Sequence, residues 1–95
     1  MGDIEVRNNP AGNRYEAWLD GELAGVAVYE PRGDAVVFTH TEVDDRFEGE
    51  CVGSTLVRAA LDDVRAQGDH EVVPLCPFVK GWIDKHPDYQ DLVRG

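Results

Sequence analysis

Residues 36–75 read VVFTHTEVDDRFEGECVGSTLVRAALDDVRAQGDHEVVPL, and this stretch decides the fold. It opens with β-branched and aromatic residues, which favour a strand. Over residues 53–67 the apolar positions recur at helical spacing, and Gly68 suits the left-handed residue that ends a helix. Residues 72–75 then predict a second short strand. We therefore expect a β-helix-β unit with parallel strands and a right-handed crossover.

The residues before this unit predict an antiparallel meander. Asp20-Gly21 is typical of a two-residue hairpin turn, and residues 31–34, PRGD, predict another turn. The segment 23–29 is apolar almost throughout, so we expect it to be buried on both faces. The segment 35–43 should lie centrally in the sheet. Alternating apolar residues place the strands at 4–6, 15–19, 23–29 and 35–43.

The residues after the unit complete the fold class. Residues 78–86 predict a short helix with Pro77 in its first turn, and residues 88–93 predict one final helical turn. At 95 residues, the chain has the length of one small domain. We expect residues 1–95 to form a single α+β domain with a mixed, mostly antiparallel sheet and a short C-terminal helix.

The charge and the cysteine content narrow the function classes. Nine Lys and Arg against nineteen Asp and Glu give a formal net charge of −10. The basic residues are scattered and form no stripe, which argues against nucleic acid. An acidic surface favours a cationic partner such as an amine, or serves solubility alone. No apolar run approaches the roughly 20 residues of a membrane span, so no membrane role is expected. With only Cys51 and Cys76, and no signal-peptide core in MGDIEVRNN, we expect a cytoplasmic protein.

The loop at residues 44–54, between the central strand and the long helix, is a candidate anion site. A turn of small residues that runs into a helix leaves several backbone N–H groups without partners. The positive end of the helix dipole adds to their attraction for a phosphate, so affinity needs no Lys or Arg. An ordinary strand–helix turn would contain the same glycines, and the loop alone leaves both interpretations open.

Three strings carry a resemblance that covers most of the chain. They are HTEV at 40–43, EGxxVGSxLVxxAL at 48–61 and VVPLCPFVxxWIxxHPxY at 72–89. Together they resemble the small GNAT-like N-acetyltransferase-domain proteins of the YjdJ type. The resemblance implies that acetyl-coenzyme A (acetyl-CoA) is the cosubstrate, that no metal is needed and that acetyl passes to an amine.

The resemblance also implies where the cosubstrate binds. The loop would wrap its diphosphate, and its pantetheine arm would pair with the exposed backbone of the strand that ends at residue 43. The family's loop has Arg or Gln, two residues, Gly, one residue, then Gly or Ala. Glu48 and Cys51 depart from this pattern, so we expect weakened affinity, and Tyr89 either lines the cleft or packs the C-terminal turn. The implied cosubstrate residues are Glu42, Val43, Glu48, Gly49, Glu50, Cys51, Val52, Gly53, Ser54 and Tyr89.

Cys76 and His40 are the candidate catalytic residues. The resemblance places Cys76 beside the thioester, where it would act as a nucleophile or as an acid towards the leaving thiolate. It lies between Pro74 and Pro77 before a helix, a position that favours a thiolate; the alternative is a small buried hydrophobe. Histidine is a common general base in enzymes, so His40 would be a general base or substrate contact, or else a satisfied core histidine.

The leading functional hypothesis is an acetyl-CoA-dependent N-acetyltransferase. Its acceptor would be an amine, either a small molecule or a protein lysine, and the protein would be a monomer or a weak dimer. One alternative is a non-catalytic module that binds or senses coenzyme A (CoA) or acetyl-CoA. Another is a protein-interaction domain with a decayed cofactor site.

Overall fold

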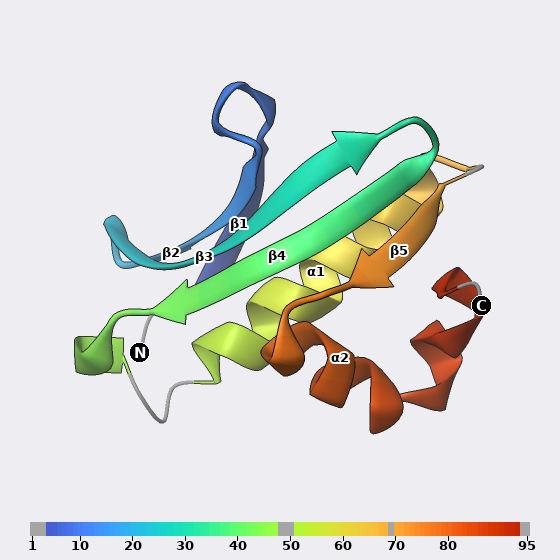
Figure 1. The fold of residues 1–95 in the computed structure, drawn as a ribbon. Helices are drawn as coiled ribbons and strands as arrows, with labels where there is room; N and C mark the ends of the chain where they lie inside the picture. The colour runs from blue at the N-terminus through green and yellow to red at the C-terminus, as the bar shows by residue number, and fades with distance from the viewer. Residues whose placement is uncertain (1–3, 48–50, 69, 94–95) are drawn as a thin grey trace.

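A computed structural model describes residues 4–47, 51–68 and 70–93 of the chain (Figure 1). Its strands form one five-stranded sheet in the order β1-β2-β3-β4-β5. The elements are β1 (Ile4–Asn9), η1 (Pro10–Gly12), β2 (Arg14–Leu19), β3 (Glu22–Arg32), β4 (Ala35–Val43), η2 (Asp45–Phe47), α1 (Val52–Ala66), β5 (Glu71–Pro74), α2 (Pro77–Asp84) and η3 (Pro87–Leu92), where η marks a 3₁₀-helix.

The sheet has the expected mixed topology. The first four strands pair antiparallel in chain order, and β5 pairs parallel to β4 after the helix α1. Asp20 and Gly21 both have positive φ, as a tight hairpin between β2 and β3 requires. Gly68, with φ of 97°, ends the helical segment. The α+β class and the β-helix-β unit are therefore confirmed.

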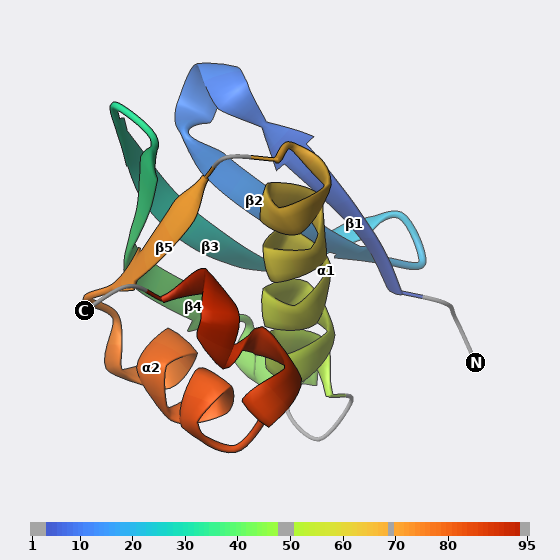
Figure 2. The ribbon, with the colours of Figure 1, turned by 90° about the vertical axis from the view of Figure 1, so that its right-hand side faces the viewer.

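The core lies between the sheet and α1. The helix runs along one face of the sheet, with α2 and the C-terminal turn beside it (Figure 2). The apolar stripe predicted from the sequence is the buried face of α1, and it contacts all five strands. Its buried residues are Val52, Gly53, Leu56, Val57, Ala60, Leu61 and Val64.

Two details of the meander differ from the sequence prediction. The expected turn at residues 31–34 is shorter, because Pro31 and Arg32 continue β3 and pair with β4. The segment 23–29 is not fully buried on both faces, since Val26 and Val28 are half-buried while Ala27 and Tyr29 are buried.

Among the described residues, no helix combines the length and apolarity needed to span a membrane.

Packing at one end of the sheet fixes where α1 begins. A Cβ built on Gly25 of β3 would lie 2.9 Å from the Glu42 carbonyl oxygen and 3.2 Å from a Val52 methyl carbon. Glycine therefore lets β3, β4 and the first residue of α1 approach one another closely. This contact holds the start of α1 against the end of β4.

A buried carboxylate joins the first two strands. Glu16 of β2 is 8 % exposed and accepts hydrogen bonds from Asn9 Nδ2 at 3.1 Å, Arg14 Nε at 2.8 Å and Trp18 Nε1 at 3.3 Å. The hydrogen bond from Asn9 is the largest cause that holds the pKa of Glu16 below its usual value; burial opposes it, and the Arg14 and Trp18 bonds add to it.

Glu16→Gln should flatten the dependence of stability on acid pH. Because the pKa of Glu16 is lower in the folded than in the unfolded chain, its carboxylate stabilises the fold above the unfolded pKa. That contribution disappears as pH falls through the folded pKa. Urea unfolding from neutral to strongly acidic pH should show a shallower loss for Glu16→Gln than for wild type. Glu5→Gln, at an exposed ion pair on β1, is the matched control, and parallel curves for all three proteins would contradict the assignment.

Candidate functional site

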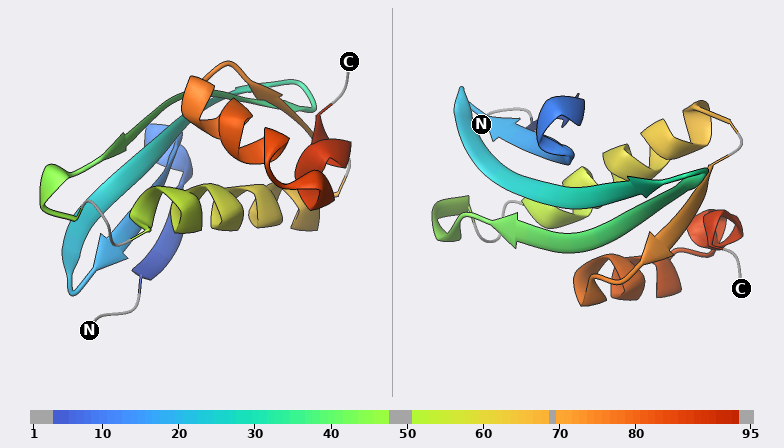
Figure 3. Two further views of the ribbon diagram at one scale, coloured as in Figure 1. Left: turned by 90° about the horizontal axis from the view of Figure 1, so that it is seen from below. Right: turned by 45° about the horizontal axis from the view of Figure 1, so that its top comes forward.

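Beyond residue 38, β4 separates from β5. The parallel pairing joins only residues 35–38 of β4 to residues 71–74 of β5, and the Cys76 amide then donates to the Phe38 carbonyl at 2.9 Å. Residues 39–43 of β4 extend past this point, with no described strand on their β5 side (Figure 3). The backbone of the second half of β4 is therefore not paired with β5.

The start of α1 faces this open half of β4. Cys51, the residue before the helix, has φ of 60°, and no side chain in the described part of the chain caps the helix. The first amide of the helix with an intrahelical partner is that of Thr55, which donates to Cys51 O at 3.0 Å. The amides of residues 52–54 precede it and are suited to an anion.

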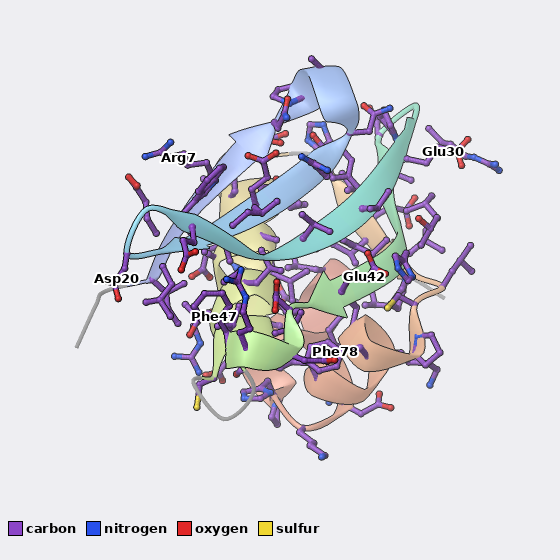
Figure 4. The ribbon with its side chains drawn as sticks, turned by 90° about the vertical axis from the view of Figure 1, so that its left-hand side faces the viewer. Arg7, Asp20, Glu30, Glu42, Phe47 and Phe78 are labelled. Atoms are coloured by element: carbon purple, nitrogen blue, oxygen red, sulfur yellow. The ribbon has the colours of Figure 1, made fainter. Side chains whose placement is uncertain are left out.

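Phe78 of α2 lies against this first turn. A Cβ on Gly53 would lie 2.7 Å from Phe78 Cζ, so the ring rests on the glycine backbone. The ring is nevertheless 47 % exposed. Figure 4 views this end of the molecule, with Glu42 on β4 and Phe78 on α2 labelled. Glycine at position 53 therefore allows α1 and α2 to approach closely, and the residue is buried at this contact.

The other loop residues predicted to bind the cosubstrate differ in their burial and in their contacts. Val52 is only 2 % exposed, and its side chain belongs to the core. The hydroxyl oxygen of Ser54 accepts a hydrogen bond from Trp82 Nε1 at 2.9 Å, which joins α1 to α2. Glu48, Gly49 and Glu50 lie outside the described residues, and their roles stay predictions.

Cys76 sits where β4 and β5 part. It is 4 % exposed, and its thiol contacts the hydroxyl of Thr41 on β4, with an Sγ–Oγ1 distance of 3.4 Å. The thiol of Cys76, two residues after the end of β5, thus contacts the half of β4 that β5 does not pair with. This contact supplies a thiol next to the strand predicted to bind pantetheine.

His40 is not a core histidine. Its side chain is 57 % exposed, and its Nε2 lies 3.4 Å from Glu42 Oε1 on the same face of β4. Because consecutive strand residues point to opposite faces, His40 faces away from the side on which Thr41 meets Cys76. The structure therefore places both candidate catalytic residues near the second half of β4 but on different faces of the sheet.

Tyr89 belongs to the packing of the C-terminal segment. Its hydroxyl donates to Asp62 Oδ1 at 2.7 Å, and its ring lies edge-on to Trp82 at 5.0 Å. Asp62 lies ten residues after the start of α1, about 15 Å along the helix axis. The structure does not bring Tyr89 to the first turn, and its role towards the cosubstrate stays a prediction.

An open pocket with an acidic wall lies at the start of β3 and the end of β4. Its volume is about 680 Å³. The side-chain hydrogen bond from Arg46 holds the pKa of the Asp44 carboxyl below its usual value, so this group is ionised at neutral pH. Arg46 itself is also paired with Glu22. The pocket is lined by Leu23, Ala24, Gly25, Val26, Thr41, Glu42, Val43, Asp44 and Asp45.

Thr41 and Phe78 are the residues that the sequence interpretation missed. Strand alternation separates Thr41 from His40, but no sequence pattern places it against a cysteine 35 residues later. Phe78 follows the PLCP string as one more apolar helix residue, and its contact with Gly53 depends on how α2 packs.

The residues present fit a diphosphate-bearing thioester. The helix start, which no described side chain caps, suits a diphosphate, and residues 39–43 of β4, which pair with no described strand on the β5 side, suit an extended arm. Cys76 lies at the far end of that segment from the start of α1. The described residues contain no cluster of three or more His, Cys, Asp or Glu side chains arranged to hold a metal ion.

Comparisons with known proteins agree with this geometry. The mouse protein NATD1 is 30 % identical over 95 residues, which span 98 % of this chain and 86 % of NATD1. The solution structure of a GCN5-like putative N-acetyltransferase from Staphylococcus aureus matches all of this chain and 92 % of its own, with a TM-score of 0.73 at 23 % identity. The ribosomal-protein-S18-alanine N-acetyltransferase of Escherichia coli matches 76 % of this chain and 64 % of its own, with a TM-score of 0.61 at 14 % identity.

The two structural matches show a shared fold. A family model described as GCN5-related N-acetyl-transferase matches residues 14–92, which include β2 to β5, both α-helices and the candidate site. The chain therefore belongs to the GCN5-related N-acetyltransferase family, as the resemblance implied.

Proposed function

We propose that this protein moves an acetyl group from acetyl-CoA to an amine, with Cys76 beside the reacting thioester. The observation that carries the proposal is the position of Cys76 at the point where β4 and β5 part, in a member of an N-acetyltransferase family. A thiol at this point meets the end of any extended arm that lies along residues 39–43.

In this proposal the cosubstrate binds through the main chain. The amides of residues 52–54 hold the diphosphate, and the edge of β4 at Glu42 and Val43 pairs with the pantetheine arm. Binding through amides suits a chain with a net charge of −10, because it requires no free cationic side chain. Arg46, the basic residue of η2, is already paired with Asp44 and Glu22.

Two routes of transfer are compatible with this placement of Cys76. In the covalent route, its thiolate attacks the thioester carbonyl, and the sulfur of CoA leaves and takes up a proton. A neutral amine then attacks the acetyl-cysteine, the Cys76 sulfur leaves as thiolate, and the amine loses its extra proton to a base. In the direct route, a neutral amine attacks the thioester, Cys76 protonates the leaving thiolate, and the amine nitrogen loses its extra proton to a base.

The acidic pocket supports an amine as the acceptor. Glu42, Asp44 and Asp45 line it, and their charges attract a cationic chain that carries the reacting nitrogen. His40 lies beside Glu42 and is placed to accept a proton from an amine that approaches its face of β4. Polyamines and lysine side chains both have the required charge.

Mass spectrometry tests the proposed transfer. The protein is incubated with acetyl-CoA and then chased with a polyamine or a lysine peptide. We expect an acetyl group on Cys76 that disappears as acetylated amine forms. The Cys76→Ser protein should carry no acetyl thioester. Acetylated amine without acetyl-Cys76 would select the direct route. Tight binding of acetyl-CoA with no acetylated amine would contradict the enzyme and favour the binding module.

Cys51→Gly should bind CoA more tightly than wild type. Cys51 lies directly before α1 with a left-handed φ of 60°, so glycine fits this backbone and also lets a diphosphate approach it more closely than a residue with a Cβ does. Titration calorimetry should show a lower Kd for Cys51→Gly. Cys51→Ala is the matched control, because it removes the thiol but keeps the Cβ. Equal or tighter binding by wild type would refute the expectation.

A further inference from the structure

Thr41 lies between two features of the site that are otherwise separate. Its hydroxyl is 3.4 Å from the Cys76 sulfur, and the same residue lines the acidic pocket of about 680 Å³. Cys76 itself is buried and is not among the residues that line that pocket. Thr41 therefore both lines the pocket and contacts the thiol of Cys76.

The surrounding chain restricts how this thiol is placed. Pro74 and Pro77 flank Cys76 and fix two nearby φ angles. The Cys76 amide donates to Phe38 O, and its carbonyl accepts from the Lys80 amide at 3.0 Å. With its backbone held on both sides, the orientation of the S–H bond depends on side-chain partners. Within the described residues, Thr41 is the one side chain that hydrogen-bonds to the sulfur.

A threonine hydroxyl can form a hydrogen bond with a cysteine side chain both as a thiol and as a thiolate. Towards a thiol it accepts the S–H hydrogen, and towards a thiolate it rotates and donates its own O–H. A hydrogen bond to a charged partner is stronger than one between neutral groups. The same hydroxyl therefore holds the resting thiol and stabilises the reactive thiolate, without losing its own proton.

We propose that Thr41 is the positioning residue for Cys76. Its hydroxyl fixes the direction of the thiol towards β4 and stabilises the thiolate on the side that faces the pocket. The catalytic use of this hydrogen bond rests on the proposed function, in which an acyl group that enters along β4 meets Thr41 and Cys76 together. The hydrogen bond itself is a property of the free protein.

Infrared spectroscopy of the S–H stretch tests the hydrogen bond directly. The Cys51→Ala protein leaves Cys76 as its one thiol, and Thr41→Val and Thr41→Ser are made in that background. An S–H that donates a hydrogen bond absorbs at lower frequency than a free one. We expect Thr41→Val to move the band to higher frequency and Thr41→Ser to leave it near its original position. Far-UV circular dichroism checks that each variant is folded.

Alkylation by iodoacetamide at one mildly alkaline pH tests the effect on reactivity. Thr41→Val should slow alkylation of Cys76 about tenfold, because the thiolate loses a hydrogen bond to a neutral donor. Thr41→Ser should restore a rate near that of the parent. An unmoved band and an unchanged rate in Thr41→Val would overturn the proposal. Equal effects of Thr41→Val and Thr41→Ser would also overturn it, because they would assign the effect to the methyl group.

Neither measurement uses CoA or an amine. A protein that shows the Thr41 effects but transfers no acetyl group would refute the proposed function and leave the hydrogen bond standing. A protein that transfers acetyl but shows no Thr41 effect would do the reverse. The two proposals therefore fail separately.

Discussion

The site depends on the unequal lengths of two neighbouring parallel strands. β4 runs from Ala35 to Val43, while β5 ends at Pro74 after four residues, so the second half of β4 has a free edge on that side. Pro74 and Pro77 stop the chain from extending β5 and turn it into α2. Cys76 is left at the base of the resulting opening. A longer β5 would pair with residues 39–43 and remove both the free edge and the proposed path for pantetheine.

In the proposed function, backbone amides bind the cosubstrate and acidic side chains attract the acceptor. A net charge of −10 repels a diphosphate at long range, and the candidate anion site is made of uncapped amides at the start of α1. Glu42, Asp44 and Asp45 instead line the pocket at the start of β3 and the end of β4, where a cationic acceptor is proposed to bind. The same acidic composition that argues against nucleic acid is thus compatible with a nucleotide-bearing cosubstrate and an amine.

The sequence predicts the elements well because their signals are local. The Asp20-Gly21 hairpin, the α1 stripe and Gly68 each depend on a few neighbouring residues, and the structure has all three. Pro31 shows the limit, since pairing with β4 overrides its turn preference. The site residues depend on contacts between distant segments. The exposure of His40, the packing of Tyr89 on α1 and the Thr41–Cys76 contact follow from how β4, α1 and α2 meet, which no local pattern encodes.

The central claim is that main-chain amides at the start of α1 and along the free edge of β4 hold CoA. An amide-resolved nuclear magnetic resonance titration of the ¹⁵N-labelled protein with unlabelled CoA tests it most directly. The account predicts that the largest shift changes fall on residues 52–55 and 41–43, with β1 and the β2–β3 hairpin nearly unmoved. Unchanged amide signals at both segments when the ligand is in large excess, or changes confined to another face, would contradict it.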